Sequence, residues 1–176
     1  MRLDYCARCG APLGLAPPCR CAACGEEFWD NPRPCGGAFV AHDGRLLLVQ
    51  RRIEPFAGYW DIPGGFCDGG EHPEAAARRE VYEETGLTIS ITGLLGMWVD
   101  RYGDSGDGDG DGVWTLNVYY EATTDDPAAA HAADETLAIG WFSPDELAAL
   151  PLAFPDSGAP AVAAWIAGQA ARSSTS

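Results

Sequence analysis

The sequence predicts an α/β domain that follows a small metal-binding unit. Apolar segments with the periodicity of β-strands recur between residues 36 and 142. A Gly-rich turn and a short helix, expected over about 73–85, interrupt these segments. Two Cys-x-x-Cys pairs lie before residue 30. The chain has 176 residues, of which 47% are hydrophobic, so one packed core is expected.

Residues 1–30 are expected to form a zinc ribbon. Each Cys-x-x-Cys pair is followed by glycine, and eleven residues separate the pairs, a spacing typical of a tetrahedral thiolate site. The segment is too small for a core of its own, so metal binding would supply its folding free energy. Two disulfides or a redox pair are the alternatives, but neither is favoured in a duplicated motif without a secretory signal. The expected Zn²⁺ ligands are Cys6, Cys9, Cys21 and Cys24. Cys19 remains open as a replacement for Cys21.

Two strands are expected over 36–42 and 45–51, joined by a tight Asp43-Gly44 turn. The continuous apolar run at 46–49 predicts that the second strand is buried on both faces. Arg51 and Arg52 follow at its end. Their guanidinium groups could bind a substrate phosphate bidentately or be ordinary surface charge, and the sequence favours neither.

The helix expected over about 73–85 carries Glu80, Glu83 and Glu84 on one side, because these residues lie three and four apart. Like charges at this spacing cost an isolated helix about 0.2–0.5 kcal/mol per pair. Acids in the last turn also oppose the helix dipole. A divalent cation would offset both costs, since Mg²⁺ prefers carboxylate oxygen and is commonly shared with substrate phosphates. Considered alone, the three acids fit a solvated face equally well.

The wider spacing resembles the Nudix box in every fixed position: Gly65, five residues, Glu71, seven residues, then Arg79 to Leu87. The resemblance implies an α/β/α sandwich on a mixed sheet and hydrolysis of a nucleoside diphosphate linked to another moiety. Arg79 and Glu71 would fix the geometry between loop and helix. The ligands that the resemblance implies for Mg²⁺ or Mn²⁺ are Glu80, Glu83, Glu84 and the Gly65 carbonyl.

The cysteine-rich segment and residues 28–34 are similar to the zinc ribbon and linker that precede the Nudix domain in NADH pyrophosphatases. That group also carries a Ser-Gln-Pro-Trp signature soon after the box, and this chain has none. ADP-ribose or another ADP-linked small molecule is therefore the expected substrate, with NAD(H) second. A non-catalytic nucleotide sensor is the alternative from another class. Such domains commonly lose box carboxylates, whereas this chain keeps them all.

Beyond the box, residues 88–100 are expected to form one or two strands interrupted at Gly93 or Gly96, and 113–122 the returning strand. The Asp-Gly segment 104–112 between them fits an acidic hairpin tip better than a calcium loop, because it lacks the EF-hand ligand pattern. A strand over 136–142, a short helix capped by Ser143 that ends near Leu150, and a final helix over about 159–171 complete the domain.

Glu135 precedes the strand at 136–142, in a loop where many Nudix enzymes place a further acid. Glu83 and Glu135 are both candidates for the general base. The expected Nudix domain spans residues 31–172, followed by a frayed tail at 173–176.

Partners and location follow from composition. The formal net charge of −15 argues against binding to nucleic acid, which depends on Lys and Arg. No apolar run reaches membrane-spanning length, and the first residues lack the apolar region of a secretory signal. A small nucleotide substrate and a cytoplasmic location are therefore expected. Nudix proteins often form homodimers, but no residue here specifies one.

Overall fold

The structure is a computed structural model, and it describes residues 2–103, 112–133 and 135–173. Two expectations concern residues outside these ranges: most of the Asp-Gly segment 104–112 and the tail at 174–176.

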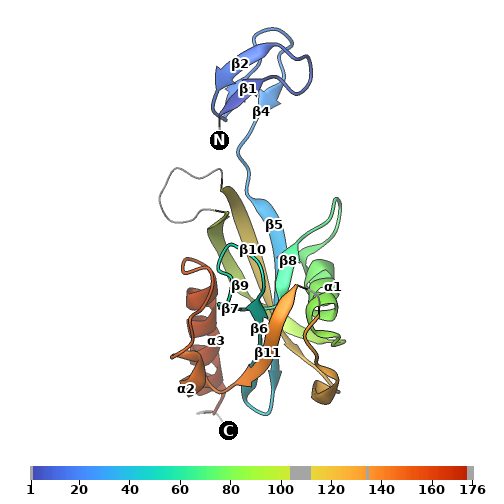
Figure 1. The fold of residues 1–176 in the computed structure, drawn as a ribbon, viewed down its shortest axis with the longest axis vertical. Helices are drawn as coiled ribbons and strands as arrows, with labels where there is room; N and C mark the ends of the chain where they lie inside the picture. Colours follow the sequence, from blue (N-terminus) through green and yellow to red (C-terminus); the bar gives the residue numbers. More distant parts are fainter. Residues whose placement is uncertain (1, 104–111, 134, 174–176) are drawn as a thin grey trace.

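Four short strands form the N-terminal unit, at one end of the molecule in Figure 1. They are β1 (Leu3–Tyr5), β2 (Pro12–Leu15), β3 (Cys19–Arg20) and β4 (Glu27–Phe28). β1 pairs with β2 and β3 pairs with β4, each pair antiparallel. A short linker then leads into the main sheet.

The main sheet has the strand order β11-β6-β5-β10-β9. β5 and β10 are parallel, whereas the other neighbours are antiparallel, so the sheet is mixed as expected. Its strands are β5 (Arg33–His42), β6 (Arg45–Arg51), β9 (Ser90–Tyr102), β10 (Val113–Thr123) and β11 (Thr136–Phe142). Two short strands extend it: β7 (Trp60–Asp61) pairs with β6, and β8 (Gly64–Phe66) pairs with β5.

Helices cover both faces of the sheet, which confirms the α/β/α sandwich (Figure 1). They are α1 (Pro73–Thr85), α2 (Pro144–Leu147) and α3 (Gly158–Ser173), with a 3-10 turn, η1, at Pro127–Ala129. Because side chains alternate along a strand, β5 supplies both layers. Val40 packs against Val81 of α1, and Phe39 packs on the other side with Trp165 of α3. Strand β6 is buried on both faces in the same way, as its apolar run predicts.

Two details of the predicted elements differ from the structure. Residues 90–102 form one strand, and the interruptions expected near Gly93 and Gly96 are irregularities in its pairing with β10. Helix α2 ends at Leu147 rather than near Leu150. Its start is as predicted: Ser143 and Glu146 form a reciprocal capping box. None of the helices in the described ranges is long and apolar enough to cross a membrane.

Candidate functional site

Helix α1 has the bounds that the sequence predicts. Its N-terminal residue Pro73 follows His72, whose Nδ1 accepts a hydrogen bond from the Glu74 N–H at 3.2 Å. It ends at Gly86, which has φ 72° and donates its N–H to the Tyr82 carbonyl. These two ends fix which residues face β8. A Cβ added at Gly65 of β8 would lie 2.6 Å from the Glu80 carboxylate, so a larger residue there would displace this carboxylate.

Arg79 joins the loop before α1 to the acidic side of the helix. Its Nε and Nη2 donate to the two Glu71 carboxylate oxygens at 3.0 and 2.9 Å, and Nη2 also donates to the Phe66 carbonyl at 3.0 Å. Nη1 donates to Glu80 Oε1 at 2.8 Å and to Glu83 Oε2 at 3.0 Å. The hydrogen bonds from Arg79 lower the pKa of Glu71 to about 2. One guanidinium therefore positions three carboxylates.

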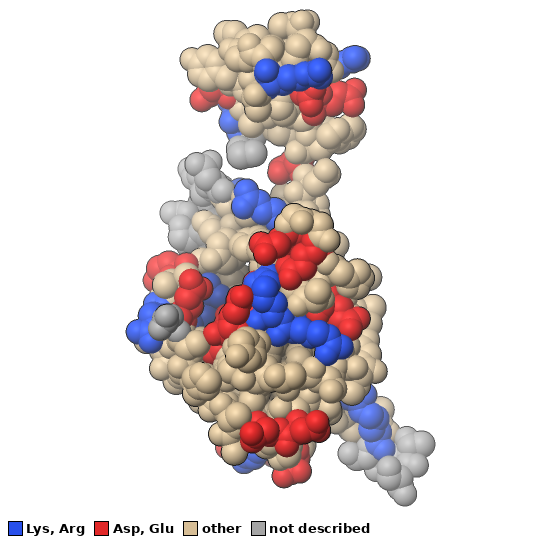
Figure 2. Space-filling model, turned by 90° about the vertical axis from the view of Figure 1, so that its right-hand side faces the viewer, with Lys and Arg blue, Asp and Glu red and all other residues tan. Residues whose placement is uncertain are grey.

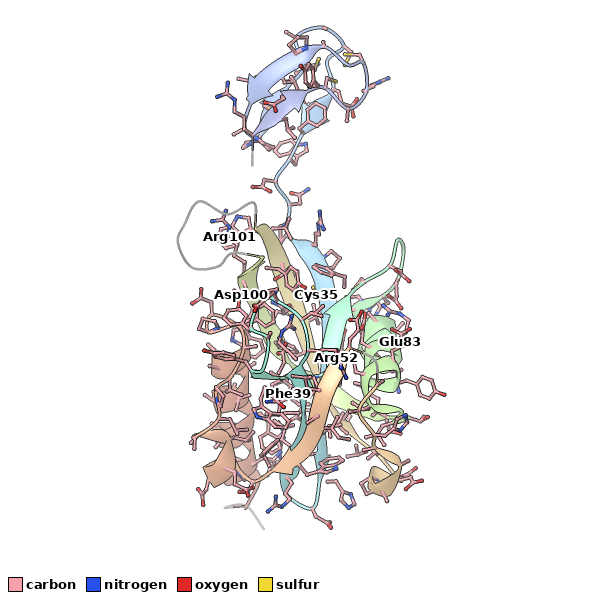
Figure 3. The ribbon with its side chains drawn as sticks, viewed as in Figure 1. Cys35, Phe39, Arg52, Glu83, Asp100 and Arg101 are labelled. Carbon is pink, nitrogen blue, oxygen red and sulfur yellow. The ribbon has the colours of Figure 1, made fainter. Side chains whose placement is uncertain are left out.

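Figure 2 looks onto the side of the molecule that carries α1 and shows acidic and basic side chains interleaved there. Glu83 lies on the exposed side of α1 in Figure 3, with 55% of its side chain accessible. Glu80 is less accessible, at 17%. Burial raises the pKa of Glu80, although its hydrogen bond with Arg79 opposes the shift.

Glu84 is the most strongly perturbed of the three acids. Burial, followed by the neighbouring negative charge of Asp61, raises its pKa to about 8. Its Oε2 accepts one hydrogen bond, from the Gly64 N–H at 3.0 Å. A desolvated carboxylate with so little positive charge nearby is costly to ionise, and a bound cation would remove that cost.

Glu80 and Glu84 line a cleft between α1, β6, β8 and the segment before β11. Glu135 faces this cleft and also the opening beside Glu83 and Glu84. Its backbone carbonyl accepts the Arg52 N–H at 3.2 Å, and Arg52 Nη2 donates to the Thr136 carbonyl at 2.9 Å. The structure thus brings Glu135 together with the box carboxylates, and Arg52 anchors the segment that carries it (Figure 3).

The loop before Glu135 is attached to the end of α1. His131 N–H donates to the Thr85 carbonyl at 3.0 Å, and Ala133 N–H donates to the Glu84 carbonyl at 3.2 Å. These bonds satisfy two carbonyls that a helix terminus leaves unpaired.

Arg51 is not ordinary surface charge, since only 15% of its side chain is accessible. Its Nη1 donates to Asp61 Oδ2 at 3.0 Å and its Nε donates to the Pro55 carbonyl at 2.8 Å. The guanidinium lies 4.9 Å from the centre of the Phe154 ring. Arg51 therefore has a fixed position in the cleft wall, whereas Arg52 is exposed.

Sequence reasoning missed several residues that shape the cleft. Asp61 is buried and accepts a hydrogen bond from Arg51. The one feature of the sequence that could have indicated it is a single acid among the otherwise apolar residues 60–63, just before the Nudix box. Tyr102 and Phe154 also line this region, but they come from distant segments that meet only in the fold. No local pattern distinguishes them.

The four predicted zinc ligands converge in the N-terminal unit. The Sγ atoms of Cys6 and Cys24 lie 3.6 Å apart and those of Cys9 and Cys21 3.8 Å apart, and all four lie within 4.8 Å of one another. Tetrahedral Zn²⁺ with Zn–S bonds of about 2.3 Å needs sulfurs about 3.8 Å apart, so the set fits. Cys19 is outside this cluster, so the geometry selects Cys21 over it.

The carboxylate site is less fully assembled than the cysteine cluster. Within the described residues, the cysteines alone bring three or more ligand atoms within 4.8 Å of one another. Glu80 and Glu83 turn toward Arg79 instead. The chemistry of the set nevertheless fits a hard divalent cation, because Glu80 and Glu84 are desolvated oxygen donors facing one cleft.

Residues 32–164 match the family model described as NUDIX domain. The chain belongs to the Nudix family. Its Nudix fold agrees with solved structures. A Nudix hydrolase from Nitrosomonas europaea is 22% identical with a TM-score of 0.69, covering 87% of this chain and 85% of that one. The Nudix domain of Shewanella oneidensis NrtR, complexed with ADP ribose, is 27% identical with a TM-score of 0.52, covering 73% and 83%.

Curated relatives of this Nudix protein carry several names. An ADP-ribose pyrophosphatase from Methanocaldococcus jannaschii is 38% identical over 68 residues, which is 39% of this chain and 40% of that protein. A putative 8-oxo-dGTP diphosphatase from Bacillus subtilis is 32% identical over 115 residues, or 63% and 68% of the two chains. An RNA pyrophosphohydrolase from Erythrobacter litoralis is 28% identical over 140 residues, or 69% and 82%. The names agree on pyrophosphate chemistry and differ in substrate.

Proposed function

We propose that this protein is a divalent-metal-dependent hydrolase that cleaves the pyrophosphate bond of a nucleoside diphosphate linked to another moiety. The observation that carries the proposal is the pair of desolvated carboxylates, Glu80 and Glu84, in one cleft with Arg51. A stable fold alone does not require two acids there, since burying them is unfavourable. A cation shared with a diphosphate makes the arrangement favourable.

Mg²⁺ or Mn²⁺ would be held by Glu80 and Glu84, with Glu83 and the Gly65 carbonyl as further ligands. When bound, the cation neutralises the diphosphate and lowers the pKa of a coordinated water. Glu80 and Glu83 would exchange their contacts with Arg79 Nη1 for the metal. Arg79 retains Glu71 and the Phe66 carbonyl, so the loop stays in register with α1 during this exchange.

Glu135 is the better placed of the two candidate bases, because Glu83 would serve as a metal ligand whereas Glu135 faces the same cleft from the segment before β11. The carboxylate accepts a proton from the attacking water, whose oxygen forms a bond to phosphorus. The bridging P–O bond breaks, and its electrons remain on the leaving phosphate. Arg51 donates two of its five N–H groups to the protein, which leaves three for a substrate phosphate. Arg52 positions Glu135 through its contacts with the neighbouring backbone and is the weaker candidate for phosphate binding.

ADP-ribose or another ADP-linked small molecule is the first substrate we propose, and NAD(H) the second. A non-catalytic nucleotide sensor is the alternative class; the NrtR Nudix domain was crystallised in complex with ADP ribose. The retained carboxylates favour the enzyme. We further propose that Zn²⁺ bound by the four clustered cysteines folds a ribbon at 1–30, separate from a Nudix domain at 31–172. A cytoplasmic location and a homodimer remain predictions.

The test is a Mg²⁺-dependent hydrolysis panel with identified products. It includes ADP-ribose, NADH, 8-oxo-dGTP, triphosphorylated RNA and UDP-sugars. Glu80→Gln and Glu84→Gln are compared with Glu74→Gln, a matched control on the same helix whose carboxylate pairs with Arg78 instead. The two cleft variants are expected to lose at least about a hundredfold in kcat/KM, whereas the control retains activity. Tight nucleotide binding without turnover by the wild type would favour the sensor.

A further inference from the structure

A second cavity adjoins the carboxylate cleft, on the face of the sheet that α3 covers. The two hollows share five residues: Arg51, Gly64, Gly65, Phe66 and Tyr102. The second cavity contains no box carboxylate, and its wall is largely apolar and aromatic. Ligand sites commonly combine such a wall with a few fixed polar groups. A diphosphate in the cleft would therefore direct its attached group into this cavity past Arg51.

The aromatic wall is formed by three rings that come from separate segments of the chain. Phe154 has φ 54°, a left-handed conformation that is strained for a non-glycine residue. Its ring lies near parallel to that of Tyr102, at 21° with centres 5.9 Å apart, and Tyr102 in turn contacts the Phe66 ring edge-on at 5.4 Å. Aromatic rings of this kind stack on a nucleobase without distinguishing one base from another. Selection among bases therefore requires a polar group.

Asn117 supplies such a group in the floor of the cavity. It lies in the middle of β10, opposite Cys35 of β5, on the same face as Tyr119. Asparagine is disfavoured in strands, and its neighbours Leu116 and Val118 face the other side of the sheet. Figure 3 labels Cys35 on β5 and Asp100 on β9, the two strands that flank β10.

The orientation of the Asn117 amide is fixed by a chain of hydrogen bonds. Thr115 Oγ1 donates to the Asp100 carbonyl at 3.3 Å, so it can accept from Asn117 Nδ2, which lies 3.2 Å away. Nδ2 is thereby directed toward Thr115, which leaves Oδ1 on the other side of the amide. Within the part of the chain that the structure describes, no group donates a hydrogen bond to Oδ1. A ligand in the cavity meets an acceptor that is already oriented.

An oriented acceptor distinguishes bases by one substituent. Adenine and cytosine carry an exocyclic amine that donates a hydrogen bond, whereas the corresponding position of hypoxanthine, guanine or uracil is a carbonyl. Two facing acceptors would both lose their hydrogen bonds to water without gaining a partner. Sites built to pair with a polar group discriminate strongly against an analogue that lacks it.

We propose that Asn117 selects nucleotides whose base carries an amine at the position of adenine N6 or cytosine N4, adenine above all, by accepting a hydrogen bond from that amine at Oδ1. The inference rests on the proposed function, because it assumes that the diphosphate occupies the neighbouring cleft. It goes further by assigning base selection to one side chain outside the Nudix box. Asn117 is a specificity residue and takes no part in the chemical step.

The test compares ADP-ribose with its hypoxanthine analogue, in which a carbonyl replaces the amine. The wild type is expected to prefer the adenine form by about tenfold to a hundredfold in kcat/KM. Asn117→Leu is expected to reduce the preference to about twofold, through a higher KM for the adenine form with kcat largely retained. Asn117→Asp keeps an acceptor at this position and is expected to keep the preference. Asn31→Leu, the same change at an exposed linker position, is the control.

The outcomes separate this inference from the proposed function. Equal hydrolysis of the two forms by the wild type, or an unchanged preference in Asn117→Leu, would overturn the inference about base selection. Neither result would contradict the proposed hydrolase function. Loss of the preference in Asn117→Asp as well would show that an acceptor at this position is not sufficient for selection, and would also overturn it. If the wild type hydrolyses neither form, calorimetric binding of ADP against IDP decides base selection independently of turnover.

Discussion

Replacing Glu84 with glutamine is expected to inactivate the protein and, in the absence of Mg²⁺, to stabilise it. The folded-state pKa of Glu84 is about 8, against an ordinary value of 4.5. Above pH 4.5 the unfolded chain releases a proton that the folded protein retains. Stability from this group is therefore fully present below pH 4.5 and is lost as the pH rises toward 8.

The size of the effect follows from the same shift. Each pH unit between 4.5 and 7 lowers the free energy of unfolding by about 1.4 kcal/mol, so the wild type loses about 3 kcal/mol at pH 7. Glutamine has no such proton, and its carbonyl can accept the Gly64 N–H that Glu84 accepts now. Glu84→Gln is thus expected to unfold about 6–12 °C above the metal-free wild type at pH 7.

The assay is thermal unfolding from pH 4.5 to 8 without Mg²⁺, with zinc left in place. Mg²⁺ is then added: it should raise the melting temperature of the wild type and leave that of Glu84→Gln unchanged. Glu83→Gln is the control, since an exposed ion pair contributes only about 0–1 kcal/mol. The reasoning is refuted if Glu84→Gln is no more stable than the wild type at pH 7, or if the difference does not shrink toward pH 4.5.

Three further predictions concern the loop, the core and the ribbon. Because Arg79 lowers the pKa of Glu71 to about 2, Glu71→Gln should be less stable than the wild type at pH 7. The difference in melting temperature between the two proteins should narrow as the pH falls from 4.5 toward 2. A difference that does not depend on pH would contradict this prediction. Gly36→Ala places a methyl group against the Pro73 carbonyl of α1, so it should lower the free energy of unfolding by denaturant by about 1–3 kcal/mol and reduce activity. Gly93→Ala is the control: a methyl group there meets nothing within 4 Å and should leave stability nearly unchanged. Zinc analysis should find one ion per chain, lost in Cys21→Ser and retained in Cys19→Ser; retention in both would reject the ligand assignment.

Elements whose ends carry local chemical signals could be predicted closely from sequence. Pro73 and Gly86 define α1, and Ser143 defines the start of α2, because proline, glycine and capping residues act on backbone groups within one turn. The β5–β6 turn at Asp43-Gly44 was accessible for the same reason: both residues adopt positive φ.

Features created by tertiary contacts could not be predicted in this way. The partner of Arg51 is Asp61, and no rule based on spacing links them. The aromatic cavity depends on Tyr102 and Phe154, which are 52 positions apart in the printed numbering and meet through the sandwich. The carboxylate spacing predicted that Glu80, Glu83 and Glu84 share a side of α1. It did not predict their unequal burial, which depends on β8 and Gly65.

Two backbone hydrogen bonds join the loop before Glu135 to the end of α1, and they limit how the length of this loop can be altered. The N–H groups of His131 and Ala133 donate to consecutive carbonyls, those of Thr85 and Glu84, so the position of the loop along the helix end is defined. An insertion or deletion between 127 and 133 would have to preserve that spacing or displace Glu135 relative to Glu84. Length variation in a surface loop is ordinarily tolerated. Here it becomes a way to change the distance between two acids without substituting either.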